Sequence, residues 1–318
     1  MGSECMKEKL KYYYSIMKSS FKFSKFYCNK KNMDGLSAEL IRYTHSMEKG
    51  LSISKIKLGF GHQKQKEMIT IIKKLEKSES NYYDEIISMA ISSLNEYIDF
   101  HESNNYQDEF IKYLKEFVNQ RKGYIKEDFG GTIDFNCDEL DLNVKDIEKL
   151  FYSRHSIRNF TDKPVDNEII KKAIKLAQRC PSACNRQGVR VYVVDNSKYD
   201  GIIKQLSGIG GFADGLDKLV IVTGKLSSYR YDEVNQYIVS ASIFAGYLSL
   251  TLHLYGLGAC IIQRSVIWNK NTEFIKREFN IDDDEQVVCM LGVGNVGGNI
   301  KVPVSHRLNI DEFAKFIK

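Results

Sequence analysis

The stretch Ser153-Arg154-His155-Ser156-Ile157-Arg158-Asn159-Phe160 is the point around which the C-terminal half of this sequence is organised. Two arginines, a serine and a histidine stand within five positions, and the apolar side chains of Ile157 and Phe160 can anchor the same backbone in a core. A guanidinium presents a planar fork of donors that matches phosphate oxygens, and a hydroxyl adds a directed neutral donor. The stretch therefore indicates a phosphate-binding site, although an Arg-x-Ser-x-Arg string alone is also typical of a solvated surface.

The composition is that of a globular protein with room for two domains. The chain has 318 residues, of which 43% are hydrophobic and 27% are charged. Seven cysteines, an odd number with irregular spacing, favour reduced thiols in a cytoplasmic protein over a disulfide framework. No apolar run approaches the ~18 residues that cross a bilayer, and we expect no secretory signal at the N-terminus.

Positive charge is concentrated at the start of the chain. Residues 1–31 contain eight lysines against Glu4 and Glu8, interleaved with Tyr and Phe, while the whole chain has a net charge of +5. A basic aromatic segment can contact an anionic membrane or a nucleic acid. More often it is a docked or frayed amphipathic helix, which is our expectation here, with no nucleic-acid partner.

Residues 1–130 predict a helical domain. From Tyr83 to Ile98 apolar side chains recur three and four positions apart, which places them on one helical stripe, and Asn81 before them is a plausible N-cap. All three prolines of the chain come later. Because Gly130-Gly131 and an acidic stretch from Asp134 to Asp146 have the character of a linker, we divide the chain into a helical domain, 1–140, and a second domain, 141–318.

The second domain alternates helices with strands. Asp166 is a candidate N-cap for a short helix that stops before Pro181, and residues 235–255 form a long apolar helix. Residues 189–194, 218–222 and 286–291 have the β-branched and apolar composition of buried strands. This order of elements predicts an α+β or α/β layer structure.

Three further segments follow the arginine stretch in a fixed order: Pro181-Ser182-Ala183-Cys184-Asn185-Arg186-Gln187, then Gly258-Ala259-Cys260-Ile261-Ile262-Gln263-Arg264, then Val302-Pro303-Val304-Ser305-His306-Arg307. The ordered set resembles the FMN-dependent nitroreductase family and covers residues 146–318. The resemblance implies an α+β, three-layer fold with a central, mostly antiparallel sheet, here preceded by an all-helical domain. It also implies a homodimer with FMN at the interface.

The resemblance assigns roles to individual residues. It implies a phosphate grip made of Arg154, His155, Ser156, Arg158 and Arg307. It implies contacts to the flavin ring, supplied by the neighbouring subunit, from Pro181, Ser182, Ala183, Asn185 and Gln187. Backbone N–H groups of Gln263 and Arg264 are expected near flavin N5, where a donor favours the reduced ring. No metal site is expected, since Cys180 and Cys184 with a proline between them and no second ligand pair are poor zinc ligands.

The sequence departs from the family where a substrate lid is usual, because only residues 223–234 separate the second strand from the long helix. The helical domain is a candidate replacement, which would bring Arg42 or His45 to the substrate side of the flavin. The alternative is that this cluster is a solvated helix end closed by Gly50. The glycines Gly292, Gly294 and Gly297 spell a dinucleotide fingerprint, but no helix is predicted after them, so we discount it.

These observations predict an FMN-dependent oxidoreductase. Hydride would pass from NADH or NADPH through flavin N5 to a small organic acceptor by ping-pong exchange, with no acid or base required from a side chain. Two alternatives stay open: a specialised flavin enzyme such as a dehydrogenase or dehalogenase, and a non-catalytic flavoprotein scaffold.

Overall fold

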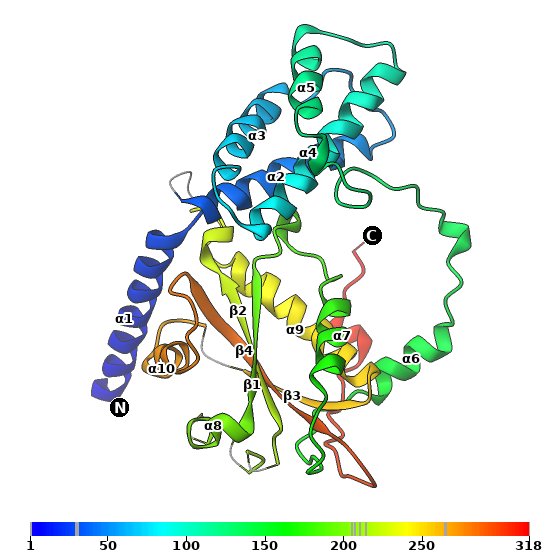
Figure 1. Ribbon diagram of the computed structural model, residues 1–318. Coiled ribbons are helices and arrows are strands. Elements are labelled where there is room, and N and C mark those ends of the chain that lie inside the picture. The colour runs from blue at the N-terminus through cyan, green and yellow to red at the C-terminus, as the bar shows by residue number, and fades with distance from the viewer. Residues whose placement is uncertain are drawn as a thin grey trace.

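The computed structural model describes residues 2–28, 32–204, 206, 208–209, 211–213, 215–263 and 266–317. An all-helical part precedes a half in which helices cover an antiparallel sheet (Figure 1). The predicted α+β class with a helical N-terminal part is therefore confirmed.

The helical part has a core of its own. It is built by α2 (Met33–Leu51), α3 (His62–Leu75), α4 (Asn81–Ser103) and α5 (Glu109–Asn119), whose apolar stripes face one another. Side-chain caps begin two of these helices, because Asn32 accepts the N–H of Gly35 at 2.6 Å and Asp108 accepts the N–H of Ile111 at 2.8 Å. The three- and four-residue spacing of the sequence thus identifies the buried faces correctly.

Two predicted helix ends are misplaced. The N-cap of α4 is Ser80, and Asn81 is the first helical residue. Gly50 lies inside α2, which ends at Leu51, and it does not adopt a left-handed conformation. The ring of Phe60 occupies the space that a Cβ at position 50 would need, so Gly50 is there for close packing and not for termination.

The sheet has the order β1-β2-β4-β3, with every neighbouring pair antiparallel. Its strands are β1 (Val189–Asp195), β2 (Lys218–Lys225), β3 (Leu257–Gln263) and β4 (Glu285–Asn295). One face packs on α7 (Asn167–Ala177) and α9 (Gln236–Leu254), and the other face carries a second cluster with α8 (Asn196–Ile203) and α10 (Lys270–Glu278). Strand alternation separates the two clusters: Val220 and Val222 belong to the first, and Leu219 and Ile221 to the second.

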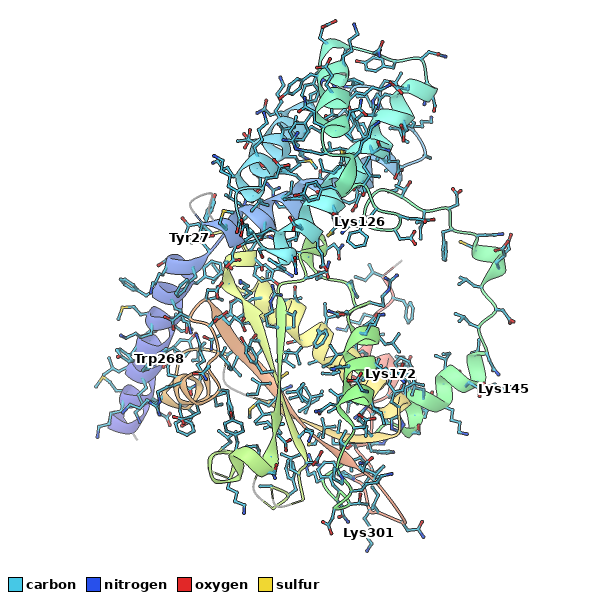
Figure 2. The ribbon with its side chains drawn as sticks, viewed as in Figure 1. Tyr27, Lys126, Lys145, Lys172, Trp268 and Lys301 are labelled. Carbon is cyan, nitrogen blue, oxygen red and sulfur yellow. The ribbon has the colours of Figure 1, made fainter. Side chains whose placement is uncertain are left out.

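The first helix, α1 (Gly2–Phe26), packs against the sheet half. Ser19 accepts the backbone N–H of Trp268 at 2.7 Å, the ring of Tyr14 lies 5.5 Å from that of Trp268, and Phe23 is buried in the α9 cluster (Figure 2). The predicted docked helix is therefore found. The division between residues 140 and 141 stays a prediction. Helix α1 precedes this division in the sequence but packs against the half that follows it.

The connection between the two parts is long and exposed. After η1 (Lys122–Tyr124) the chain follows a wide arc through η2 (Cys137–Glu139) to α6 (Val144–Ser153), on which Lys145 lies (Figures 1 and 2). After β4 the chain runs to the short α11 (Ile310–Phe313) near its end. Among the described helices α9 is long and apolar enough to cross a membrane by length and composition, and half of it is buried inside the protein. The prediction that no stretch is long and apolar enough to do so is therefore wrong for α9.

We predict that the helical part loses stability in mild acid through His101. The ring is fully buried: Nε2 accepts the N–H of Gly59 at 2.9 Å, and Nδ1 lies 2.7 Å from the carbonyl of Tyr97. Burial lowers the pKa of His101, because the neutral ring satisfies both contacts and a proton on Nε2 would break one. The folded state therefore binds fewer protons than the unfolded state. The neutral ring of His101 makes its full contribution to the free energy of unfolding above the unperturbed pKa of about 6.5. At lower pH this contribution decreases, by at most about 1.4 kcal/mol for each pH unit.

Urea unfolding at pH 7.5 and 5.5 checks this for the native chain, His101→Gln and the exposed control His306→Gln. The loss of stability between the two pH values should shrink in His101→Gln alone. An equal loss in all three proteins contradicts the assignment.

Candidate functional site

The arginine stretch is anchored by its backbone to β3. Ser156 forms a parallel bridge with Ala259, whose carbonyl accepts the N–H of Ile157 at 3.0 Å. Residue 258, which precedes Ala259, has to be a glycine, because a Cβ at this position would lie 2.9 Å from the side chain of Ile157. With its backbone fixed, the stretch can direct polar side chains outward.

The same stretch lies at the C-terminal end of α9. The hydroxyl of Ser153 is 2.7 Å from Nε2 of His253, in the last turn of that helix. Burial, together with the charges of Arg154 and His155, lowers the pKa of His253. The neutral form of His253 is therefore favoured beside two groups that carry or can carry positive charge.

Three of the predicted phosphate ligands are arginines without an acidic partner. Within the described ranges, no carboxylate lies at ion-pair distance from Arg154, Arg158 or Arg307. Arg158 and Arg307 are exposed, and each donates to the carbonyl of a nearby serine, Ser156 and Ser305 respectively. Cations left without counter-charge are suited to an anionic ligand. Their convergence on one phosphate stays a prediction.

The second segment, around η3 (Ala183–Asn185), has an unusual backbone. Cys184, Asn185 and Gln187 all have positive φ, of 50°, 51° and 49°. Non-glycine residues rarely adopt this conformation, and groups of them persist only where surrounding contacts enforce it. Ser182 contributes one such contact by accepting the N–H of Gln187 at 3.1 Å.

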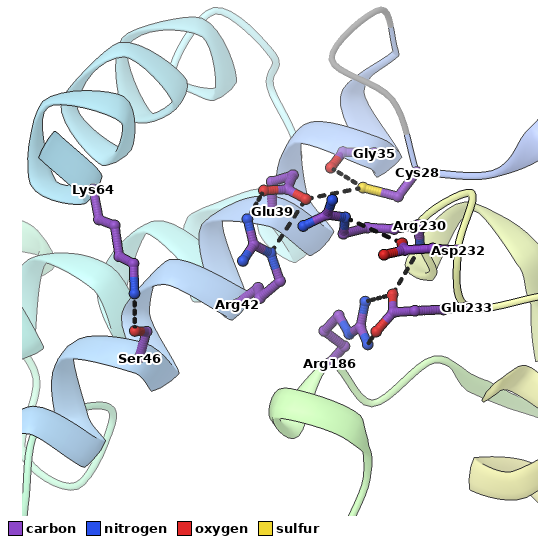
Figure 3. A network of polar contacts seen from close by, with 10 residues as sticks. All are labelled: Cys28, Gly35, Glu39, Arg42, Ser46, Lys64, Arg186, Arg230, Asp232 and Glu233. Carbon is purple, nitrogen blue, oxygen red and sulfur yellow. Dashed lines mark hydrogen bonds and ion pairs between the residues drawn. The ribbon is translucent and has the colours of Figure 1, made fainter.

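Arg186 holds this segment in place. Its side chain is 1% exposed, and its two terminal nitrogens each donate to Glu233 at 2.6 Å, just before α9 begins (Figure 3). Burial alone would raise the pKa of Glu233, but the hydrogen bonds from Arg186 outweigh it and lower that pKa. The guanidinium also lies 5.0 Å from the ring centre of Tyr229. The sequence did not indicate this structural role of Arg186, because its partner Glu233 lies 47 positions away and no local pattern predicts the pairing.

The helical part docks beside this segment. The N–H of Cys28 donates to the carbonyl of Tyr229 at 2.6 Å, and Asp34 pairs with Lys225 at 3.1 Å. The buried thiol of Cys28 faces Glu39 (Figure 3). Burial, with the charge of Glu39, raises the pKa of Cys28 to about 12. The thiol therefore stays protonated and serves the junction as a packed group.

The two substrate-side candidates have different surroundings. Arg42 is bound to Glu39 at 2.6 Å and stacks on Tyr43 at 4.5 Å, so its charge is already matched. His45 lines an open groove of about 720 Å³ between the helical part and the segment from Pro181 to Gln187. Its Nδ1 also lies 3.6 Å from Glu48. Of the pair, His45 is the one that remains a candidate for contact with a ligand.

A second cavity of about 470 Å³ adjoins the groove. The two spaces share lining residues from both parts of the molecule, namely Glu85, Met89, Gln178, Cys180, Ser182 and Gln187. Helix α4 therefore forms one wall of a space whose other wall is the predicted flavin-contacting segment.

The two predicted cofactor-binding segments lie at opposite ends of α9. The arginine stretch contacts His253 near its C-terminus, and the Pro181–Gln187 segment contacts Glu233 next to its N-terminus. A helix of this length, 19 residues, is about 28 Å long. The third predicted segment ends β3, where Gln263 is exposed, and Arg264 lies outside the described residues.

Comparison with known proteins agrees with the sequence pattern. Residues 152–209 match the model of the Nitroreductase family. The resemblance to that family is confirmed. A putative NADH dehydrogenase/NAD(P)H nitroreductase from Archaeoglobus fulgidus is 34% identical over 89 residues, which are 26% of this chain and 49% of that protein. The chain thus spans about half the length of this curated relative.

Solved structures with similarity to the nitroreductase-like half include a putative nitroreductase from Bacillus subtilis, at 20% identity and a TM-score of 0.49, covering 55% of this chain and 100% of that one. Another is a putative nitroreductase in complex with FMN from Desulfovibrio desulfuricans, at 17% identity and a TM-score of 0.47, covering 54% of this chain and 96% of that one.

We predict that the Arg186–Glu233 pair is a major support of the segment. Glu233→Gln leaves a buried guanidinium without its counter-charge, which should lower the free energy of unfolding by about 3 kcal/mol. The matched control is Glu168→Gln, whose partner Lys171 is 71% exposed and whose loss should cost under about 1 kcal/mol. Urea unfolding measures the free energy of unfolding of both variants. Equal losses in the two variants would contradict a major role for the Arg186–Glu233 pair.

Proposed function

We propose that the protein is an FMN-dependent oxidoreductase that transfers hydride from NADH or NADPH to a small organic acceptor, with the two substrates using one site in turn. The observation that supports this most is a set of three arginines, Arg154, Arg158 and Arg307, that have no acidic partner among the described residues. Arg154 and Arg158 lie within the stretch that matches the family model. The FMN complex of one structural relative and the nicotinamide named for the curated relative agree with it.

The residues present fit a flavin mononucleotide. Arg154, Arg158 and Arg307 would neutralise the phosphate, with Ser156 as a neutral donor and His155 beside them. Ser182, Asn185 and Gln187 would lie along the ring on a backbone that is already fixed. When bound, FMN would supply the hydride chemistry through N5. The chain's own residues would bind the phosphate, orient the ring and exclude water from it.

We further propose that each flavin site is completed by a second copy of the chain. The two cofactor-binding segments are about 28 Å apart along α9 in one protomer. Two chains related by a two-fold axis, with their α9 helices antiparallel, would bring the arginines of one to the Pro181–Gln187 segment of the other. Two equivalent sites per dimer would result.

The exposed surface of α9 has the character of such an interface. Val239, Ile243 and Tyr247 form an exposed stripe, and Ser242 and Gly246 between them allow close approach. Of the small residues on this helix, Ala241, Ala245 and Ser249 instead face the protein's own core.

The C-terminal segment is also richer in exposed apolar side chains than a monomer tolerates. Val304 and Phe316 are each 87% exposed, and Leu308 and Phe313 are similarly open. Phe151 and Tyr152 of α6 are exposed as well. Exposed apolar groups in this number favour a surface that a partner covers, and we propose a second copy of the chain as that partner.

We predict selective loss of FMN when the phosphate arginines are removed. The double variant Arg158→Met, Arg307→Met should bind FMN about a hundredfold more weakly, since each charge-assisted contact contributes about 1.5–3 kcal/mol. Affinity for riboflavin, which lacks the phosphate, should be unchanged. Quenching of flavin fluorescence measures both constants, with the exposed Arg277→Met as control. A native protein that binds no FMN, or parallel loss of both flavins in the double variant, contradicts the proposal.

We also predict that charges on the exposed face of α9 separate the protomers. Ile243→Lys with Tyr247→Lys should shift the protein from dimer to monomer and remove FMN binding together, because like charges would face each other across the axis. Analytical ultracentrifugation and flavin content are the measurements. Ile53→Lys, at a 56% exposed position in the helical part, is the control. A variant that stays dimeric, or a monomer that keeps FMN, speaks against an interface through α9.

A further inference from the structure

The 470 Å³ cavity between the helical part and the sheet is predominantly apolar. Helices α2 and α4 contribute Ile41 and Ile86, and the sheet half contributes Val189, Val191 and Phe244. The exposed ring of Tyr82 lies at the same cavity. Walls of this kind favour a flat, mainly apolar ligand, because such a ligand exchanges water for apolar contact on both faces.

One cation that lines this apolar space, Arg190, has no acidic partner among the residues that the structure describes. Arg190 wraps around the edge strand β1, where one terminal nitrogen donates to the carbonyls of Gln187 at 3.1 Å and Val189 at 2.8 Å. The other donates to the hydroxyl of Tyr82 at 3.3 Å, and the guanidinium lies 5.6 Å from that ring's centre. In the described part of the chain no carboxylate is at ion-pair distance from it. Arg190 is therefore pre-oriented, with a charge that an anionic ligand would balance.

The charge of Arg190 also acts on one buried acid, Glu285, which lies beyond ion-pair distance from it. Glu285 is buried and hydrogen-bonded to Thr223, and burial raises its pKa. The other charged groups at the cavity are Arg186, which Glu233 already neutralises, and Glu85.

Glu85 adds a constraint on the ligand. It lines both the cavity and the adjoining groove, its side chain is exposed, and no described cation is paired with it. A second negative group on a ligand would approach this carboxylate at the opening. A monoanion is therefore favoured over a dianion.

The cavity is continuous in its lining with the segment proposed to contact the flavin. Ser182 and Gln187 belong to both spaces, and Met89 faces them from α4. A ligand held in the cavity would thus lie next to that segment, where an acceptor has to be.

We propose that this cavity is the acceptor site and that it selects planar aromatic monoacids, with Arg190 binding the acid group and α4 forming the specificity wall. The assignment of the bound ligand as an electron acceptor rests on the proposed function. The binding of an aromatic acid in this cavity does not. The helical part would then act as the substrate-recognition element of the enzyme.

The test compares 2-naphthoate with 2-naphthamide, which have nearly the same shape and differ in charge. Isothermal titration of the oxidised full-length protein, without nicotinamide, measures both affinities. We expect naphthoate to bind about tenfold more tightly, as a charge-assisted pair is worth more than a neutral one. Arg190→Met should abolish the difference, Arg190→Lys should keep part of it, and the distant control Arg277→Met should keep all of it.

Two further variants test the walls. Met89→Trp, which fills the cavity from α4, should weaken both ligands. Glu85→Gln should strengthen binding of 2,6-naphthalenedicarboxylate relative to naphthoate. Equal binding of the two probes by the native protein, preference retained in Arg190→Met, or indifference to Met89→Trp overturns the site.

Failure of the proposed function is separately visible. A protein that binds naphthoate as predicted but whose flavin is not reduced by NADH or NADPH keeps the aromatic-acid site and loses the redox role. A protein that reduces acceptors with no preference for the acid loses the site and keeps the redox role.

Discussion

The length of α9 is the constraint on which the arrangement of the site depends. This helix packs along the sheet, and the two segments that we propose to bind the cofactor contact its ends through His253 and Glu233. Because a helix of 19 residues is rigid and about 28 Å long, the two segments of one chain cannot be drawn together without dismantling the core. We propose that two antiparallel copies of the same helix bring the segments together by symmetry, and the exposed stripe along α9 is consistent with that arrangement.

The position of the helical part is defined relative to the same helix. It docks through Cys28, Asp34 and the buried polar groups around Glu39, next to the end of α9 that carries Glu233. That position puts α4 over the Pro181–Gln187 segment, where the connection between β2 and α9 is too short to form a cover. We propose that this folded layer takes the place of a loop as the cover of the site, since a packed helix holds its side chains more rigidly than a surface loop does.

The sequence predicted the elements and the segments well, for identifiable reasons. Apolar spacing located the buried face of α4, the β-branched and apolar composition located the strands β1, β2 and β4, and Asp166 caps α7 as expected. Helix ends were less accurate at Gly50 and Asn81, because close packing against Phe60 and the cap position at Ser80 depend on neighbours that a local pattern does not contain. The roles of Arg186 and Arg190 were not predicted, for the same reason. These roles depend on contacts with Glu233 and Tyr82, which are distant in sequence.

The most direct test of a flavin site shared between two chains is complementation of two defective variants. One variant lacks the phosphate arginines, through Arg158→Met and Arg307→Met, and the other lacks the ring-side groups, through Asn185→Gly and Gln187→Gly, which preserve the left-handed backbone. Each alone should bind little FMN at a flavin concentration near the native Kd, since the loss of affinity in the arginine variant is about a hundredfold. After mixing in equal amounts and reassembly, half of the dimers contain one intact site, so the account predicts about one bound FMN for every four chains. Mixed dimers that bind no FMN would contradict a site built from two protomers.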